Sequence, residues 1–476
     1  MKFDALPGID IRGLAYDSRQ VKPGDVFIAL KGLKAAGADF AAEAIRRGAV
    51  AVVADRPADA HVAVPWVLVP DARAAMAALA AEFYGHPSRS MQVVGITGTN
   101  GKTTTAYLLR AVFEAAGKKC GLLGTVSYSV GDQELPAART TPEAPDVQRM
   151  FRQMVDAGCR ACVMEVSSHA LALRRVDGTA FAAAVFTNLT RDHLDYHGDM
   201  ESYFTAKRRL FDMLPSGAPG ALNLDDPRGE SLKKMVSTPI TYAINKQADV
   251  TPGPLTLTFE GLEFDARTPK GAVHVRSRLV GRPNVSNILA TVAIATALDI
   301  PASAIERGLA SLGGVPGRFE LVSSSKNDIV VVIDYAHTDD ALKNLLETAR
   351  PLAQRRVITV FGCGGDRDRT KRPLMGAVAA RLSDVVVMTS DNPRSEDPAR
   401  IIEEIKRGIP PASDRSAATF AVLDRKEAIQ FAIKKAEPGD LVLLVGKGHE
   451  QTQMIGREEL PFDEAAIARA ALERRR

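Results

Sequence analysis

The chain has 476 residues, of which 46% are hydrophobic, and a formal net charge of +4. This length suits about three domains with packed cores, and the small net charge does not indicate a nucleic-acid surface. The first ten residues contain acidic side chains and no apolar run, so no secretory signal is expected. The longest apolar stretch, 288–298, is too short to span a bilayer, and the expected setting is the cytoplasm.

The four cysteines do not suggest a disulfide framework, because they are few for so long a chain. Cys159 and Cys162 form a C-x-x-C pair, but no second pair or histidine pair stands near them in metal spacing. The segment around Cys162, ACVMEV, is typical of a buried strand. Core cysteines are therefore favoured over a zinc or redox role.

Val93–Thr105, VVGITGTNGKTTT, is the stretch around which the chain is organised. It predicts a strand, a glycine-rich turn and the start of a helix. Gly98 and Gly101 would let backbone N–H groups approach an anion, aided by the helix dipole. Lys102 could then reach the β- and γ-phosphates, and the Thr103 hydroxyl could bind Mg²⁺. The first glycine of the usual phosphate-loop pattern is replaced by Ile96, and an ordinary glycine turn is the alternative.

Residues 1–88 predict a small α/β unit in which turns, short apolar strands and the helix 72–84 alternate. No catalytic constellation stands out there. Ser18 and Arg19 lie in a turn-rich stretch, 17–25, and a binding role and a solvated turn are equally consistent with their spacing.

Residues 89–314 contain the phosphate loop and again alternate strands with helices. Glu165 ends a predicted buried strand, ACVME, and ligands bind at the carboxyl ends of strands in open parallel sheets. Glu165 is therefore a candidate Mg²⁺ carboxylate, with a capping glutamate as the alternative.

A second polar segment follows the next predicted strand and places Asp192, His193, Asp195 and His197 within six residues. A solvated charged loop is the simple interpretation, but its place after a strand favours a loop close to the metal. The helix predicted at 203–214 carries Lys207, which by its local pattern belongs on the surface.

Residues 220–280 predict a β-rich insert, and a helix running to Leu298 follows it. Asn284 and Asn287 lie three residues apart and can share one face of that helix. Asn284 could instead cap the helix, whereas Asn287 lies inside it.

Residues 315–476 predict a third α/β unit in which polar clusters follow three apolar strands. These clusters would meet at one edge of a parallel sheet, where their positive charge could hold a carboxylate. Pro393 would stiffen the turn that presents Arg394, although Arg394 could instead cap the following helix. The side chains concerned are Arg367, Arg394, Lys447, His449 and Glu450.

Taken together, GITGTNGKTTT, TTPE, EVSSHAL, FTNLTRDHLDYHG, YFTAKRRLF, GRPNVSN, VPGRFE, DYAHTDD, FGCGGDRD, DNPRSEDP and GKGHEQ resemble the Mur ligases. The resemblance runs from about Asp17 to Gln451, and DNPR is similar to the members that add meso-diaminopimelate rather than lysine. It implies an ATP-dependent ligase of three α/β domains. These are an N-terminal uridine-binding domain (1–88), a central P-loop ATPase-like parallel sheet (89–314) and a C-terminal Rossmann-like domain for the amino acid (315–476).

The resemblance also implies roles for individual residues. Lys207 matches a lysine carried as a carbamate at a magnesium ion, with Thr103, Glu165 and His193 as the other metal positions. The implied ATP contacts are Gly98, Thr99, Asn100, Gly101, Lys102, Thr103, Thr104, Asn287, Arg318 and Asp334. The implied contacts to the UDP-MurNAc-dipeptide are Ser18, Thr140, Thr141, Ser167 and Arg175, while Leu173 stands where some members have glutamine. The implied diaminopimelate contacts are Arg367, Asp391, Asn392, Pro393, Arg394, Gly446 and Glu450.

The implied partners are small molecules, namely ATP, UDP-MurNAc-L-Ala-D-Glu and meso-diaminopimelate. Mg²⁺ is the implied cofactor, and the enzyme is expected to be a monomer. The chemistry fits, because phosphoryl transfer to a carboxylate requires anion-binding N–H groups, a lysine and a metal ion. The lysine-adding ligases and folylpolyglutamate synthetase are alternatives, against which DNPR and TTPE argue. A P-loop switch or motor is another, and it leaves DNPR and GKGHE unexplained.

Overall fold

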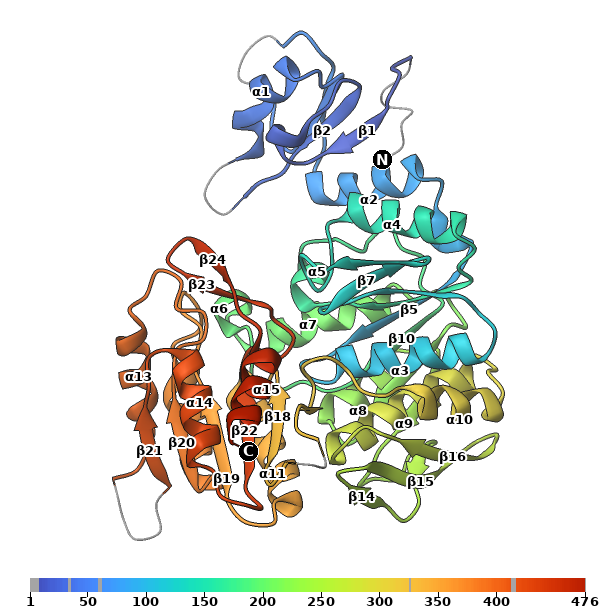
Figure 1. The fold of residues 1–476 in the computed structure, drawn as a ribbon. Coiled ribbons are helices and arrows are strands. Elements are labelled where there is room, and N and C mark those ends of the chain that lie inside the picture. The colour runs from blue at the N-terminus through green and yellow to red at the C-terminus, as the bar shows by residue number, and fades with distance from the viewer. Residues whose placement is uncertain (1–7, 33–35, 59–61, 325–326, 412–416, 476) are drawn as a thin grey trace.

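The computed structural model describes residues 8–32, 36–58, 62–324, 327–411 and 417–475, and the expectation about a secretory signal falls mostly outside these ranges. Three α/β units follow one another along the chain, each built on its own sheet (Figure 1). The predicted fold class is therefore confirmed. Within the described residues, no helix combines the length and apolar character needed to cross a membrane.

The N-terminal unit is a four-stranded parallel sheet in the order β1-β2-β3-β4. Its second strand, DVFIA, is buried along its whole length, and β-branched and aromatic residues suit such a strand. The last long helix, α2, packs against α4 of the next unit, so it joins the two. The elements are β1 Gly13–Ala15, η2 Ser18–Gln20, β2 Asp25–Ala29, η3 Gly37–Phe40, α1 Ala41–Arg46, β3 Ala51–Ala54, β4 Trp66–Leu68, α2 Ala72–Phe83 and η4 Pro87–Arg89.

The central unit is an eight-stranded mixed sheet in the order β12-β11-β10-β5-β9-β6-β7-β8, with β5 near its middle. All neighbours pair in parallel except at the edge formed by β7 and β8. The elements to this point are β5 Gln92–Thr97, α3 Lys102–Ala115, β6 Cys120–Leu123, β7 Ser127–Val130, β8 Gln133–Pro136, α4 Ala144–Asp156, β9 Ala161–Glu165, α5 Ser168–Ala172, β10 Ala183–Phe186, α6 Leu194–His197, α7 Met200–Asp212, β11 Pro219–Asn223, α8 Pro227–Lys233 and β12 Thr238–Tyr242.

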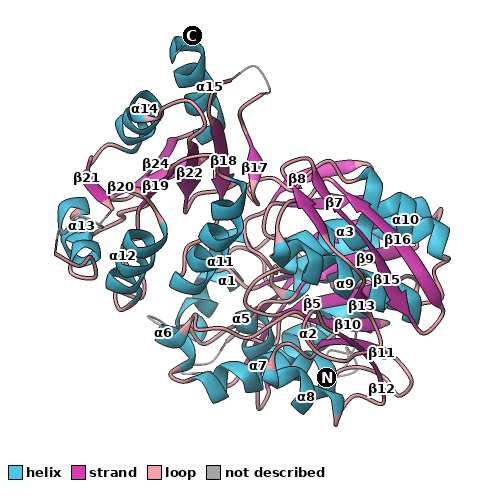
Figure 2. Ribbon diagram, turned by 90° about the horizontal axis from the view of Figure 1, so that it is seen from below, coloured by secondary structure: helices cyan, strands magenta, loops and turns pink. Residues whose placement is uncertain are grey.

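The predicted β-rich insert at 220–280 is too wide, because β11 pairs in parallel with β10, β12 pairs in parallel with β11, and both extend the main sheet. Only the small antiparallel sheet after them is an insert (Figure 2). Its strands and the two helices that follow are β13 Thr251–Pro252, β14 Thr256–Thr258, β15 Gly261–Thr268, β16 Gly271–Ser277, α9 Arg282–Ala297 and α10 Ala302–Ser311.

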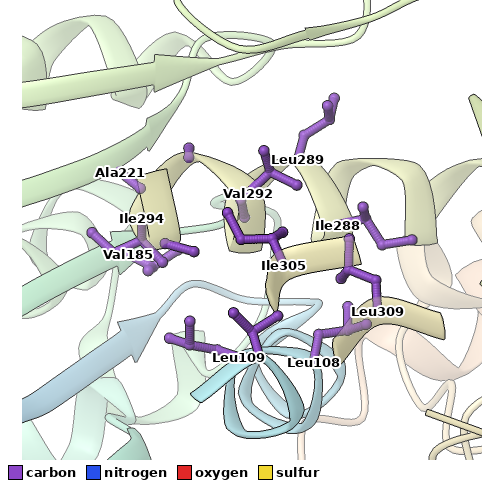
Figure 3. Close-up of a cluster of buried hydrophobic side chains, with 14 of the residues drawn as sticks. Leu108, Leu109, Val185, Ala221, Ile288, Leu289, Val292, Ile294, Ile305 and Leu309 are labelled. Atoms are coloured by element: carbon purple, nitrogen blue, oxygen red, sulfur yellow. The ribbon is translucent and has the colours of Figure 1, made fainter. Parts of the chain in front are cut away.

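The largest core lies where α3, α9 and α10 pack together over the central sheet. Leu108 and Leu109 of α3 face Ile305 and Leu309 of α10, and Ile294 of α9 packs beside Val185 of β10 (Figure 3). Each of these side chains is buried, and removing its apolar surface from water stabilises the fold by about 2 kcal/mol per residue. This core holds the helix that follows the phosphate loop firmly against the sheet.

The C-terminal unit is a six-stranded sheet in the order β17-β18-β22-β19-β20-β21, parallel except for β17. Three neighbouring strands, β22, β19 and β20, are those that the polar clusters follow. The elements are β17 Glu320–Leu321, β18 Val330–Asp334, α11 Asp339–Ala349, η5 Arg350–Leu352, β19 Val357–Phe361, α12 Lys371–Leu382, β20 Val385–Met388, α13 Pro398–Lys406, β21 Ala418–Ala421, α14 Arg425–Lys435, β22 Leu441–Val445, β23 Thr452–Ile455, β24 Glu458–Pro461 and α15 Glu464–Arg475.

The four cysteines are buried, and none forms a disulfide. Burial raises the pKa of Cys120, Cys159, Cys162 and Cys363, which disfavours the reactive thiolate. The prediction of core cysteines is confirmed.

Candidate functional site

The predicted strand, loop and helix are present at the phosphate loop: β5 ends at Thr97, and α3 begins at Lys102. Gly101 precedes the helix with a left-handed φ of 88°, and a Cβ there would lie 2.3 Å from Asn287 Oδ1. The Lys102 Nζ donates to the carbonyls of Gly98 and Thr99, both at 2.8 Å. Burial lowers the pKa of Lys102. The lysine thus folds back over its own loop, where a phosphate would meet it.

Glu165 faces this loop from the end of β9. One carboxylate oxygen, Oε2, accepts from the hydroxyls of Thr103 and Thr125 at 3.0 Å each, and Oε1 accepts from the Thr125 N–H at 2.8 Å. The next helix, α5, is capped by Ser167 instead. The capping alternative for Glu165 is therefore wrong, and its carboxylate and the Thr103 hydroxyl are brought together as predicted.

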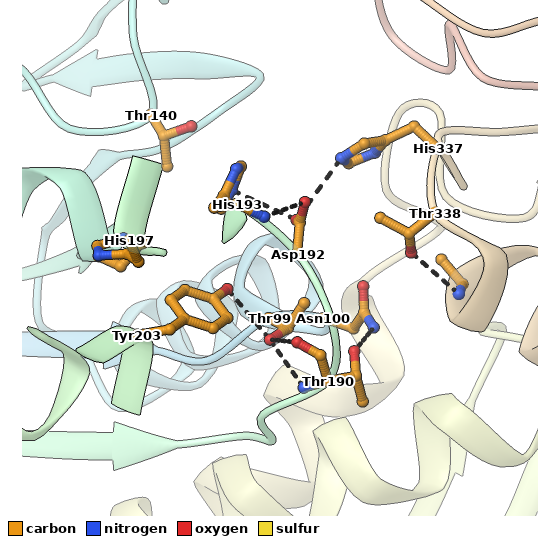
Figure 4. Close-up of polar contacts among 12 residues, drawn as sticks. Thr99, Asn100, Thr140, Thr190, Asp192, His193, His197, Tyr203, His337 and Thr338 are labelled. Atoms are coloured by element: carbon orange, nitrogen blue, oxygen red, sulfur yellow. Dashed lines mark hydrogen bonds and ion pairs between the residues drawn. The ribbon is translucent and has the colours of Figure 1, made fainter. Parts of the chain in front are cut away.

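The acidic and histidine-rich loop reaches the site only in part (Figure 4). Asp192 and His193 line the same cavity as Glu165 and the phosphate loop, whereas Asp195 is exposed. The Nε2 atom of His193 lies 3.3 Å from Asp192, and burial lowers the pKa of His193, which keeps the ring neutral. His197 instead contacts the Ser168 hydroxyl at 3.0 Å. Among the described residues, no three histidine, cysteine, aspartate or glutamate side chains are grouped closely enough to hold a metal by themselves.

Lys207 is buried, with 2% of its surface exposed, so its prediction as a surface residue is wrong. Its Nζ donates to the Gly98 carbonyl at 2.7 Å and lies 4.5 Å from the centre of the Tyr203 ring. Burial lowers its pKa well below the usual value. A signal was available in the sequence, because Lys207 falls on the apolar stripe of α7 formed by Tyr203, Leu210 and Phe211.

The cavity next to the loop has a volume of about 300 Å³ and is lined from both the central and the C-terminal units. Arg318 crosses between these units, since its Nη2 donates to Thr103 at 3.3 Å while its guanidinium lies 4.5 Å from the Tyr335 ring. Asn100 Nδ2 crosses as well and donates to Asp340 at 3.2 Å. The sequence-predicted residues that line the cavity are Thr99, Asn100, Gly101, Lys102, Thr103, Thr104, Thr140, Glu165, Ser167, His193, Asn287, Arg318 and Asp334.

Asn284 and Asn287 do share one face of α9, because Asn287 Nδ2 donates to Asn284 Oδ1 at 2.9 Å. Gly281 is the N-cap of α9, so the capping alternative for Asn284 is wrong. Asp334 ends β18, and its two carboxylate oxygens accept from the backbone N–H groups of Phe319 and Ala336. These contacts fix the segment that carries Arg318.

Four of the residues matched to the UDP-MurNAc-dipeptide lie together beside Glu165. Thr141 Oγ1 donates to the Glu165 carbonyl at 2.8 Å and accepts from the Ser167 N–H at 3.1 Å, and Arg175 Nη1 donates to the Thr141 carbonyl at 3.1 Å. Thr140 joins them through Thr125, with 3.1 Å between their hydroxyls.

Ser18 stands apart from those four residues in the N-terminal unit, where its hydroxyl donates to Glu43 at 3.0 Å. Arg19 forms an ion pair with the neighbouring Asp17 at 2.8 Å. The solvated-turn alternative describes Arg19 well, and Ser18 is buried.

The polar clusters of the C-terminal unit meet at one sheet edge, as predicted. Arg367 and Arg394 both flank Gly364, where a Cβ would lie 3.7 Å from Arg367 Cγ and 3.0 Å from Arg394 Nη1. Arg394 has a left-handed φ of 52°, and Asp397 caps the following helix, so the capping alternative for Arg394 is wrong.

The glutamate of this edge is already paired. Glu450 Oε2 accepts from Asn392 Nδ2 at 2.8 Å and from the Nζ of the fully buried Lys447 at 3.1 Å. Gly446 lies against Asp391, since a Cβ there would be 2.6 Å from the Asp391 carboxylate. Lys447 therefore points into the protein, where it holds Glu450 in place and does not contact a ligand.

His449 departs from the predicted carboxylate-binding group. Its ring lies 5.1 Å from that of Tyr335, on the side of the cavity that Arg318 occupies. Burial lowers its pKa to about 4, and the nearby charge of Arg318 acts in the same direction. His449 thus belongs to the seam between the two units and not to the arginine loops.

Sequence reasoning missed several residues that organise these sites. Thr125, which donates two hydrogen bonds to Glu165, stands in no recognisable pattern. Glu143 of the TTPE motif is buried and pairs with Arg73, Arg139 and Arg175. Only the motif itself could have singled it out.

Comparison with known proteins gives matches along most of the chain. Residues 10–84 match the model of the Mur ligase family catalytic domain, 96–295 that of the Mur ligase middle domain, and 317–448 that of the Mur ligase glutamate ligase domain. The UDP-N-acetylmuramoyl-L-alanyl-D-glutamate–2,6-diaminopimelate ligase of Geobacillus thermodenitrificans is 49% identical over 98% of this chain and 96% of its own. The ligase of the same name from Solibacter usitatus is 48% identical, with coverage of 98% and 94%.

Solved structures agree with these matches. A UDP-N-acetylmuramoyl-L-alanyl-D-glutamate–2,6-diaminopimelate ligase superposes with a TM-score of 0.68 at 33% identity, covering 98% of this chain and 95% of its own. The MurF ligase of Thermotoga maritima in complex with ADP superposes with a TM-score of 0.68 at 19% identity, covering 98% of this chain and all of its own. At that identity the second likeness concerns the fold alone.

Proposed function

The chain belongs to the Mur ligase family, and from this premise we propose that it joins meso-2,6-diaminopimelate to UDP-N-acetylmuramoyl-L-alanyl-D-glutamate at the expense of ATP. One observation carries the proposal furthest. The cavity at the phosphate loop is walled by the central and C-terminal units together, so an activated substrate and an incoming amine can meet there. A ligase needs such a meeting point, whereas a simple nucleotide switch does not.

In this proposal each of the three units binds a different substrate or part of a substrate. Residues 1–88 hold the uridine end of the nucleotide sugar, with Ser18 among the contacts, and residues 89–314 hold ATP and the dipeptide. Residues 315–476 hold diaminopimelate. Because the nucleotide sugar and ATP are intracellular metabolites, we place the reaction in the cytoplasm, and we propose that the enzyme acts as a monomer.

The phosphate loop binds and orients ATP through its backbone N–H groups and Lys102. Lys102 exchanges its two loop carbonyls for phosphate oxygens, which are stronger, charged acceptors. Arg318 and Asn287 approach from the two sides of the loop and position the rest of the nucleotide.

The donor set beside the loop fits a magnesium ion, since Mg²⁺ prefers oxygen ligands and here a hydroxyl and a carboxylate are in contact. We assign Thr103, Glu165 and His193 to hold it, together with Lys207 as a carbamate. The buried position of Lys207 beside the loop supports that assignment. When bound, the ion neutralises phosphate charge.

The glutamyl carboxylate of the dipeptide lies beside Thr140, Thr141, Ser167 and Arg175 and receives the γ-phosphoryl group, giving an acyl phosphate and ADP. The amine of diaminopimelate then attacks the acyl carbon and expels phosphate. Arg367 and Arg394 bind the distal carboxylate, and Asn392 and Glu450 bind the distal ammonium group. Contacts across the seam, such as Arg318 with Thr103, exclude water from the intermediate.

An oxygen-transfer experiment tests the acyl phosphate directly. UDP-MurNAc-L-Ala-D-Glu labelled with ¹⁸O in the glutamyl carboxylates is turned over with ATP and meso-diaminopimelate, and the released phosphate is analysed by mass spectrometry. One labelled oxygen in the phosphate per amide formed is expected. Unlabelled phosphate would refute activation of the carboxylate by ATP.

A further inference from the structure

Two loops carry the arginines assigned to the distal carboxylate, and their backbones touch. The first, 362–370, follows β19, and the second, 389–397, follows β20. The Gly365 N–H donates to the Asn392 carbonyl at 2.9 Å, and a Cβ on Gly365 would lie 1.9 Å from the Pro393 carbonyl. Only glycine allows this approach, so the distance between the loops is set by contact.

Arg372, in the first turn of α12, lies beneath both loops and is fully buried. Its Nη2 donates to the Gly364 carbonyl of the first loop at 3.2 Å and to Glu396 Oε1 of the second loop at 2.8 Å. Its Nη1 donates to Glu396 Oε2 at 2.9 Å and to Glu404 Oε2 at 2.8 Å. A single guanidinium group therefore holds the two loops at a fixed separation.

Glu396 connects Arg372 by hydrogen bonds to the residues next to Arg367 and Arg394. Its Oε1 accepts from the Asp366 N–H at 2.6 Å, and Asp366 in turn accepts from the Ser395 hydroxyl at 2.7 Å. Asp366 and Ser395 are the chain neighbours of Arg367 and Arg394. Through Glu396, the chain neighbours of both arginines are therefore connected to Arg372.

The backbone of Arg394 needs such a support. Its φ of 52° is left-handed, which costs an L residue free energy, so the conformation persists only where surrounding contacts hold it. The hairpin β23–β24 holds one side, since Arg394 N–H donates to the Met454 carbonyl and the Arg394 carbonyl accepts from the Gly456 N–H. The Arg394 side chain is held on the other side by the Gly365 carbonyl at 2.8 Å, on the loop that Arg372 anchors.

A fully buried arginine is a costly way to obtain stability alone, because replacing a buried ion pair by apolar residues is often neutral. Together these contacts assign Arg372 as a positioning residue: we propose that it sets the separation of the Arg367 and Arg394 guanidinium groups and thereby the preference for an amino acid with a distal carboxylate. The proposal rests on the proposed function. Arg372 itself does not touch the amino acid, because its side chain has no exposed surface.

The test compares Arg372→Met and Arg372→Lys with Arg356→Met as matched control. Arg356 lies in the same unit at the opposite end of β19, and its Nε and Nη2 atoms donate to the carboxylate of the buried Asp440. For each full-length variant, kcat and KM are measured for meso-diaminopimelate, lysine and ATP, and the melting temperature is recorded.

Arg372→Met is expected to raise the KM for meso-diaminopimelate at least tenfold, to leave the KM for ATP within twofold, and to narrow the selectivity over lysine. Arg372→Lys should recover thermal stability more than selectivity, because an ammonium group cannot hold both loops at once. Arg356→Met should lower the melting temperature without changing selectivity. A folded Arg372→Lys or Arg372→Met enzyme with wild-type selectivity, or equal losses for the amino acids and ATP, would overturn the proposal.

A double variant separates positioning from a general defect. If Arg372 acts through Arg394, the selectivity of Arg372→Lys combined with Arg394→Ala should equal that of Arg394→Ala alone. Additive losses would overturn the proposal. The wild-type enzyme separates a failure of the proposed function from a failure of the positioning role of Arg372. If the wild-type enzyme shows no preference for diaminopimelate, the proposed function is refuted. If the wild-type preference persists in the Arg372 variants, only the positioning role is refuted.

Discussion

Gly101→Ala tests the geometry of the phosphate loop. The left-handed φ of 88° at Gly101 is accessible to alanine only at a cost of about 1–2 kcal/mol. The added Cβ would lie 2.3 Å from Asn287 Oδ1, so Asn287 must move and lose its hydrogen bond to Asn284, worth about 1 kcal/mol. The sum is a destabilisation of about 2–3 kcal/mol, concentrated at the nucleotide site.

Gly117→Ala is the matched control, because Gly117 has a similar φ of 76° and no atom within 4 Å of an added Cβ. We expect the control to show only the backbone cost of about 1–2 kcal/mol. Thermal unfolding reports the stability of both variants, and calorimetric titration reports ADP binding. Gly101→Ala should weaken ADP binding at least tenfold, or about 1.4 kcal/mol, with no change for Gly117→Ala. Equal behaviour of the two variants would refute the assigned contact between the loop and Asn287.

Three further predictions concern single side chains. Lys207→Ala should lower kcat by about 10²–10³, as loss of one preorganised charged group does, and a small carboxylic acid should restore part of it; unchanged turnover would exclude a catalytic role. Arg394→Ala should lower kcat/KM for meso-diaminopimelate by a factor that corresponds to about 2–5 kcal/mol, and it should narrow the preference for meso-diaminopimelate over lysine. An unchanged preference in competition assays would show that Arg394 does not bind the distal carboxylate. The Arg372 guanidinium lowers the pKa of Glu396 to about 2 from 4.5, so the stability it contributes is complete above about pH 4.5 and lost toward pH 2. Glu396→Gln should therefore lower the melting temperature more at pH 7 than at pH 3, and an equal effect at both would show that the charge is unimportant.

Local patterns predicted the helices and the order of the sites because these depend on short-range signals. The strand, glycine turn and helix of the phosphate loop are encoded within thirteen residues, and the polar clusters directly follow apolar strands. The register of the strands and the choice of neighbouring strand could not be predicted in the same way. β11 and β12 read as part of an insert because a short apolar strand does not reveal which neighbour it pairs with.

The roles of buried polar residues depend on contacts between segments far apart in the sequence. Lys207 read as a surface residue, although it lies on the apolar stripe of α7, because a charged side chain normally avoids such a position. Its partner, the Gly98 carbonyl, is 109 residues away. Arg372 gave no signal, since only the fold brings Gly364, Glu396 and Glu404 around it. The position of His449 just after an apolar strand groups it with the arginines, whereas the tertiary structure places its ring against Tyr335.

The central claim is tested most directly by phosphate release from ATP. The enzyme is supplied with UDP-MurNAc-L-Ala-D-Glu alone and then with meso-diaminopimelate, lysine or ornithine in turn. Sustained release is predicted only when the nucleotide substrate and an amino acid are both present, with meso-diaminopimelate far ahead of the two diamino acids that lack a distal carboxylate. Steady release without an amino acid, or equal release with lysine, would contradict the proposed ligase reaction.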